Sequence, residues 1–515
     1  MRPKTHQVSH YPLLALTARD QCLRNQDLLA EILSSGARNS TDLASTRRTL
    51  YSAALTSKFF SECAVKLLWR RLSHILPLLR LLPTFRLEGE VYILPDLVTE
   101  EEWAVVHRYA AYVRDIGFTP HSRGDSLGNR VSLDPSVYVL LAMHGRPLFP
   151  NLRRLVLLTK GYIAEMLLCL SSSIKSLTLE SVSDIWAETF LDRLASDGAH
   201  LSYLSLGNYH RPNPLLSKSI AFQTLRVLEL RGMDKDIAAA QLTEVGSLPA
   251  LQSFATDMVG WDGLELTSVA RQGLFRTLTD LKINATPARL YHNIPDFLSV
   301  TSSGEMQSLS IGTSIGERWE ATTHSAAILS AIMRCIGARW ATTLRHLDIH
   351  RIAGGPDDLA PLEEVTGLQK VSLKCVLHEP LSHPRILSVI RTWTNLRTLE
   401  IDGPGAEADV VFLRFLAEHC PALRMLRVAY TAAPPPPLDV TAPMTSHLLE
   451  ELWFVPPGRG DIWNRTKITR LAQYFDHFFP HLICIRGEGH MWWEEVEQLV
   501  FKYQDRRHTN SQTLM

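Results

Sequence analysis

The sequence lacks an excess of charge of either sign. It has 53 basic and 53 acidic residues, so its formal net charge at neutral pH is zero. Proteins that bind nucleic acid or acidic membranes through electrostatic attraction usually carry a basic excess. The composition therefore gives no electrostatic reason to expect nucleic acid or a membrane as the main partner.

Paired cysteines and long apolar runs are missing as well. The 7 cysteines lie far apart, and none belongs to a Cys-x-x-Cys pair. Scattered cysteines of odd number are typical of proteins in a reducing compartment. The first residues show no apolar segment of the signal-peptide type, and no run approaches the roughly 20 apolar residues that span a bilayer. We therefore expect a cytoplasmic or nuclear protein.

A short pattern of the form apolar-x-x-apolar-x-apolar recurs through most of the chain. A clear copy is Leu396, Leu399 and Ile401, and most copies start 22 to 28 residues after the previous one. The other clear copies begin at Leu152, Ile174, Leu201, Leu225, Leu278, Met306, Leu344, Leu368, Leu423 and Leu449, and weaker copies begin at Leu251 and Leu482. A period in this range indicates a solenoid.

The last two apolar positions of each copy are two residues apart, so they share one face of a short strand. Segments between the copies, such as Ile185–Leu194 and Val410–Leu416, have the composition of helices. One strand and one helix cannot close a core, but stacked copies bury their apolar faces against each other. The alternation predicts an α/β fold with a parallel sheet.

This repeat resembles the leucine-rich repeat over residues 149–487. The family's Asn or Cys, eight residues after the first apolar position, is absent; Lys160, Val182, Tyr209 and Met233 stand there instead. Because that side chain normally builds a hydrogen-bond ladder in the turn, we expect an irregular horseshoe of parallel strands and helices. An ordinary α/β domain with chance spacing is the alternative.

In residues 24–85 the spacing of the apolar side chains predicts three amphipathic helices that form a small bundle. The segments that carry a family resemblance are Asp27–Ile32, Leu50–Phe60, Ala64–Leu72 and Leu76–Pro83. They resemble the F-box, in particular that of F-box proteins of mushroom-forming (basidiomycete) fungi, and leucine-rich repeats follow it in many such proteins. The resemblance implies that the bundle docks onto a Skp-type adaptor of a cullin–RING ubiquitin ligase. The adaptor-binding residues that it implies are Leu28, Leu29, Ile32, Leu33, Leu50, Leu55 and Phe59.

The start of the first helix departs from the F-box pattern. Arg24 replaces an apolar anchor, and Asn25 replaces the proline of the first turn. Asp27 keeps a negative charge near the helix start, where it is favourable. The alternative for the bundle is that it only caps the apolar end of the solenoid.

The other segments show no repeat. Residues 1–23 are expected to be a tail, residues 86–148 a linker or capping region, and residues 488–515 a C-terminal cap and tail. Trp492 and Trp493 are expected to help close the open end of the core.

Signals for catalysis or metal binding are weak. Gly124–Gly128 has the spacing of a nucleophile elbow around Ser126, but it lies in a polar segment. Gly403–Ala408 follows a strand, but no acidic residue ends the next strand, as a dinucleotide site requires. His378 and His383 are five residues apart with a proline between them. We therefore expect no enzyme and no cofactor.

The residues that flank the second apolar position of each copy should line the exposed face of the sheet. On this face His346, Asp348 and His350 alternate along one strand, which suits either a metal or a partner-binding surface; we favour the latter. The full set is Tyr203, Glu229, Arg231, Lys282, His346, Asp348, His350, Lys370, Lys374, Glu400, Asp402, Arg427 and Trp453.

These side chains are mixed in charge and include two aromatic anchors, which suits a protein partner. Together with this surface, the resemblance to F-box proteins implies a non-catalytic, substrate-recognising subunit of an SCF-type ubiquitin ligase, with an unknown protein substrate on the repeats. The alternatives are a leucine-rich-repeat interaction scaffold with no ubiquitin role, and an enzyme that uses one of the weak motifs.

Overall fold

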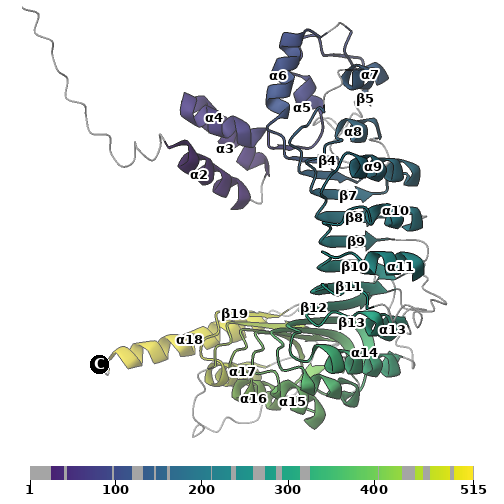
Figure 1. Cartoon of the computed structure of the whole chain (residues 1–515). Helices are drawn as coiled ribbons and strands as arrows, with labels where there is room; N and C mark the ends of the chain where they lie inside the picture. Colours follow the sequence, from purple (N-terminus) through teal and green to yellow (C-terminus); the bar gives the residue numbers. More distant parts are fainter. Residues whose placement is uncertain are drawn as a thin grey trace, which may run out of the picture. The chain divides into compact units, whose positions relative to one another are not determined.

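Figure 1 shows the computed structural model of the chain, in which short strands alternate with helices. The structure describes residues 25–513 except 40–42, 96–97, 119–131, 144–146, 159–162, 210–211, 233–238, 259–272, 286–292, 314–324, 378, 404, 432–446, 456–463 and 488–491. The chain divides into two compact units, residues 1–182 with 192–200, and residues 183–191 with 201–515.

The first unit begins with the three helices expected between residues 24 and 85, namely α2 (Gln26–Asn39), α3 (Leu43–Thr56) and α4 (Lys58–Leu68). Asn25 caps α2, because its side-chain oxygen accepts hydrogen bonds from the backbone N–H groups of Asp27 and Leu28. The bundle buries Leu29 of α2 and Leu50 of α3 together with Cys63 and Ala64 of α4.

The sheet of the first unit contains β1 (Arg71–Leu72), β4 (Asp115–Phe118), β6 (Arg154–Leu157) and β7 (Ser176–Glu180), paired in parallel in that order. The sheet therefore starts before the first predicted repeat. A further copy of the apolar pattern, Val113, Ile116 and Phe118, lies in the segment expected to be a linker, and all three side chains are buried. Helices α5 (Leu76–Leu79), α6 (Glu100–Ala110), α7 (Pro135–Met143) and α8 (Ile163–Leu168), and a small sheet of β2 (Arg86–Glu88), β3 (Val91–Ile93) and β5 (Ser132–Leu133), complete the unit.

The second unit carries most of the repeats. Its strands pair in parallel in chain order: β8 (Tyr203–Gly207), β9 (Val227–Arg231), β10 (Ser253–Met258), β11 (Asp280–Ala285), β12 (Ser308–Thr313), β13 (His346–Gly354), β14 (Lys370–Leu377), β15 (Thr398–Asp402), β17 (Met425–Tyr430), β18 (Glu451–Val455) and β19 (Cys484–Gly487). The short β16 (Glu407–Ala408) pairs with β17.

Helices follow these strands and pack on one side of the sheet (Figure 1). They are α10 (Pro212–Ser219), α11 (Ala239–Gly246), α13 (Asn293–Val300), α14 (Ser325–Trp340), the 3-10 helix η2 (Pro356–Glu364), α15 (Pro384–Arg391), α16 (Val410–His419) and α17 (Arg465–Phe478). The last helix, α18 (Trp492–Thr513), follows β19 at the end of the sheet, and the residues of α9 (Asp184–Ser196) are divided between the two units. The predicted fold class, an α/β leucine-rich-repeat solenoid of parallel strands and helices, is confirmed.

The core follows from the register of the strands. Leu347, Val371 and Leu399 are aligned on β13, β14 and β15, and each is fully buried. Burying a side chain of this size contributes about 1.5–3 kcal/mol, so the repeated pattern supplies the main stabilisation. Tyr209, which stands where the family pattern has Asn or Cys, is also fully buried, so an aromatic ring packs at this turn.

The C-terminal end of the core is closed by α18. The ring of its Trp493 is buried and stacks on Phe454 of β18, with 4.1 Å between the ring centroids. Gly487 lets the ring approach, since a Cβ atom there would lie 1.8 Å from Trp493. No helix in the described part of the chain is long and apolar enough to cross a membrane.

Candidate partner-binding face of the sheet

The exposed sheet face of the second unit is lined by the side chains that alternate with the buried anchors. In register across neighbouring strands, one row of this face runs through Ser205, Glu229, Ala255, Lys282, Ser310, Asp348, Ser372, Glu400, Arg427, Trp453 and Arg486. We call it the central row. Every partner-binding residue predicted from the sequence lies on this row or two residues from it along the same strand, which keeps it on the same face.

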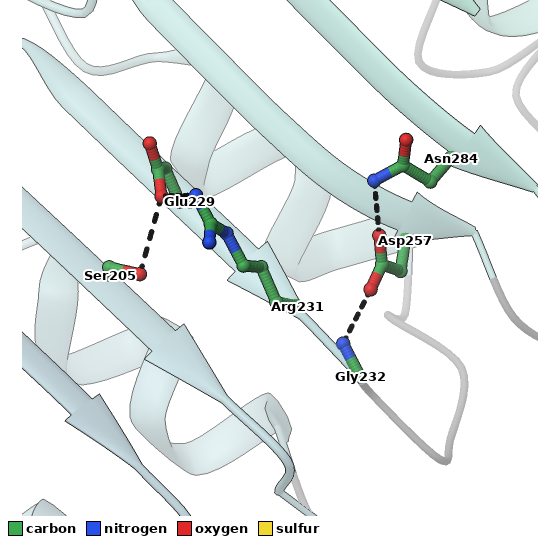
Figure 2. Close-up of polar contacts among 6 residues, drawn as sticks. All are labelled: Ser205, Glu229, Arg231, Gly232, Asp257 and Asn284. Atoms are coloured by element: carbon green, nitrogen blue, oxygen red, sulfur yellow. Dashed lines mark hydrogen bonds and ion pairs between the residues drawn. The ribbon is translucent and has the colours of Figure 1, made fainter. Parts of the chain in front are cut away.

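The first polar cluster of the face surrounds Glu229 on β9 (Figure 2). Its carboxylate accepts hydrogen bonds from the Ser205 hydroxyl at 3.4 Å and from the Arg231 guanidinium at 2.5 Å. Burial raises the pKa of Tyr203, and the Glu229 carboxylate raises it further. The predicted residues Tyr203, Glu229 and Arg231 are thus brought together.

The second cluster surrounds Asp257 on β10 (Figure 2). One carboxylate oxygen accepts from the backbone N–H of Gly232 at 2.5 Å, and the other accepts from the Asn284 side chain at 2.7 Å. Gly232 has a left-handed φ of 57°, and a Cβ atom there would lie 2.2 Å from the Asn208 side chain. The sequence prediction missed Asp257 and Asn284, although each lies three residues after a buried anchor, Phe254 and Leu281.

The third cluster surrounds Asp348 on β13. His350 contacts one of its carboxylate oxygens at 2.5 Å, and the Ser310 hydroxyl donates to the other at 3.1 Å. Burial raises the pKa of Asp348, but hydrogen bonding and charge from His350, with the hydroxyl groups of Ser372 and Ser310, outweigh it and leave this pKa below its usual value. No group of three or more metal-ligating side chains exists among the described residues, so His346 does not complete a metal site with this pair.

The remaining charged residues of the face lie on β14 to β19. Glu400 faces Lys370 at 4.0 Å, and Asp402 is in register with Lys374. The guanidinium group of Arg486 lies 4.6 Å from the ring centre of Trp453. Arg486 was not predicted, because it lies in the weak repeat copy that starts at Leu482.

Among the motifs considered for catalysis, those that lie within the described residues have structural roles. Gly403 and Gly405 have positive φ, and the chain after them enters β16 before α16 starts, so no helix start faces this turn. The side chain of His383 caps α15 by accepting a hydrogen bond from the backbone of Arg385. Gly124–Gly128, with Ser126, and His378 lie outside the described residues.

The predicted adaptor-binding residues divide into two groups. Leu28, Ile32, Leu55 and Phe59 are exposed, and their exposed fractions range from 46% to 71%. Leu33 is half-buried, whereas Leu29 and Leu50 are buried and stabilise the bundle from inside. Tyr51, which was not predicted, is also exposed and lies one helical turn before Leu55.

No protein-family model matches the sequence, and no curated protein is significantly similar to it. Solved structures with similar folds include a chain of the mouse RP105/MD-1 complex, with 16% identity over 69% of this chain and 56% of that chain and a TM-score of 0.38. A leucine-rich-repeat protein of Leptospira interrogans has 16% identity over 61% of this chain and 73% of that chain, with a TM-score of 0.36. A chain of the Drosophila Toll–Spatzle complex has 11% identity over 68% of this chain and 52% of that chain, with a TM-score of 0.36. The chain therefore spans little more than half the length of the first and the third of these proteins.

Proposed function

We propose that the protein is the substrate-recognising subunit of an SCF-type ubiquitin ligase. The helical bundle would bind a Skp-type adaptor, and the exposed sheet face would bind a protein substrate. Such a receptor needs no catalytic group of its own, because holding the substrate near the ligase raises its local concentration.

The observation that carries the proposal is the set of exposed apolar side chains on the bundle. Leu28 and Ile32 are four residues apart on α2, so they share one face of that helix. Tyr51 and Leu55 have the same spacing on α3, and Phe59 follows at the start of α4. Exposed apolar side chains in groups are typical of protein-binding surfaces.

Co-purification with a Skp-type adaptor tests the first half of the proposal. Ile32→Asp and Leu55→Asp alter exposed side chains, so we expect them to abolish the complex and leave the fold intact. Ile185→Asp is a matched control, because Ile185 is 72% exposed but lies on α9, outside the bundle. A complex that survives both bundle variants would contradict adaptor docking through this face.

A specific contact favours the second candidate, a scaffold whose bundle only caps the repeats. The Arg47 side chain of α3 donates a hydrogen bond to the backbone oxygen of Arg71 at 3.2 Å, and Arg71 belongs to the first strand of the sheet. The bundle is thus attached to the end of the solenoid. A well-folded full chain that forms no complex with the adaptor would support this candidate.

The sheet face is tested by charge reversal at Glu400 and Asp402. Glu400 forms an ion pair with Lys370 at 4.0 Å, and Asp402 is in register with Lys374 on the neighbouring strand. Glu400→Lys and Asp402→Lys would therefore create a cationic surface there. We expect captured substrate to be lost while the adaptor complex remains. Unchanged capture would exclude this part of the face as the substrate site.

A further inference from the structure

A cavity of about 520 Å³ lies within the first unit, between the bundle and the start of its sheet. Its described lining comes from α2, α3 and α4 and from the strands β1, β4 and β6. The volume is within the usual range of small-molecule sites, about 300–1,000 Å³. The exposed residues of the proposed adaptor face do not line it, so the cavity is a separate feature of the bundle.

Guanidinium groups dominate the charge around the cavity. Its lining contains Arg47, Arg70, Arg71 and Arg154 but only two carboxylates, Glu31 and Asp115. Asp115 lies in register between Arg71 and Arg154, and it forms an ion pair with Arg71 at 3.4 Å. The lining therefore has a formal charge excess of two positive units.

Arg114, which is half-buried, lies near one of the guanidinium groups of the lining, that of Arg70. The guanidinium group of Arg114 donates to the backbone oxygens of Ala111 and Asn151. Burial lowers the pKa of Arg114, and the charges of Arg153 and Arg70 lower it further. An anion bound in the cavity would offset the charge of Arg70, which lines it.

Besides the hydroxyl groups of Ser34, Thr46 and Ser73, the rest of the lining is apolar and leaves open space. Leu50, Leu72 and Ile116 contribute aliphatic carbon, and Val156 contributes more from β6. Gly117 of β4 adds no side chain, and the nearest atom to a Cβ atom built there is the Val156 Cβ atom at 3.9 Å. The cavity thus combines an apolar wall with a cationic rim.

We propose that this cavity binds a small amphipathic anion, in which a carboxylate or a phosphate is attached to an apolar body. The guanidinium groups would hold the anionic group, because their planar forks match carboxylate and phosphate oxygens. The aliphatic side chains would cover the apolar body. This inference does not depend on adaptor binding.

Calorimetric titration of the full chain tests the inference with four probes. These are 2-naphthoate, 2-naphthyl phosphate, the neutral 2-naphthamide of nearly the same shape, and acetate, which has the charge without the ring. We expect one saturable site for at least one naphthyl anion, and binding at least tenfold weaker for the amide and for acetate. The stronger of the two naphthyl anions identifies the preferred anionic group. No binding of either anion, or equal binding of the amide, would refute the proposal.

Variants locate the site. Arg154→Gln should weaken binding about tenfold, the usual effect of losing a charged hydrogen-bond partner. Arg153→Gln is the matched control, since it removes the same charge from the preceding residue, which does not line the cavity. Gly117→Phe should fill the cavity and abolish binding, and circular dichroism would check its fold. Full binding by folded Gly117→Phe, or by Arg154→Gln, would place the ligand elsewhere.

Discussion

Replacing Trp493 by alanine should release the C-terminal end of the solenoid. The side chain is 2% exposed, stacks on Phe454 at 4.1 Å, and meets Tyr430 edge-on at 6.4 Å. Truncation of a buried tryptophan to alanine costs about 3–5 kcal/mol, and an aromatic pair contributes about 0.5–1.5 kcal/mol beyond its buried area. We therefore expect a loss of about 4 kcal/mol from the last repeat.

The loss should be local, because each repeat of a solenoid contacts mainly its neighbours. Hydrogen exchange followed by mass spectrometry is the suitable assay, since it reports the free energy of local opening for each segment. Peptides from β18 and β19 should lose protection in Trp493→Ala, while peptides from β9 and β10 keep it. Trp453→Ala is the control, because this tryptophan lies on the exposed sheet face. Normal protection of β18 and β19 in the Trp493 variant would show that α18 does not hold the end of the core.

Three further predictions concern single residues. Gly232→Ala should lower the free energy of unfolding in urea by about 2 kcal/mol, because φ at Gly232 is positive and the added Cβ atom would collide with Asn208. Gly304→Ala is the control and should change stability far less, because open space surrounds that position. Asp348 has a lowered pKa, so its charged form stabilises the fold above the unfolded pKa of about 3.9, and this contribution is lost as the pH falls through the folded pKa. The stability advantage of the wild type over Asp348→Asn should therefore be present at neutral pH and shrink in acid, and an advantage that grows in acid would contradict the assignment. Burial raises the pKa of the Cys420 thiol to about 12, so iodoacetamide should label Cys420 only after unfolding, as mass spectrometry of native and denatured protein would show.

The buried half of the repeats was predictable because strand geometry dictates it. Residues two apart on a strand face the same way, so Leu399 and Ile401 mark both the strand and its buried side. The copy at Val113 was harder to recognise, since Gly117 lies between its last two apolar residues and no leucine is present. Leucine content therefore identifies most repeats, and the spacing of buried positions identifies the rest.

The positions of the residues on the exposed sheet face were predictable, but their hydrogen-bond partners were not. The alternation places Glu229 and Asp348 on the open face, but it does not show that Ser205 or Ser310 provides a hydrogen bond from the neighbouring strand. Such contacts depend on register between segments 24 or 38 residues apart. The cavity in the first unit was not predictable for the same reason, because it needs the packing of α2 and α3 against strands that follow much later.

These pairings affect how a partner would bind the sheet face. The carboxylates of Glu229, Asp257 and Asp348 already accept hydrogen bonds within the protein, so a cationic partner would have to share or replace contacts that exist without it. Such exchange adds little affinity but penalises a wrong partner, which makes this part of the face a source of specificity. Trp453 and Arg486 differ, because a flat ring under a guanidinium group offers an apolar surface and a cation together. We therefore expect the binding energy to concentrate at the β18–β19 end of the face and the selection of the partner at the β9–β13 end.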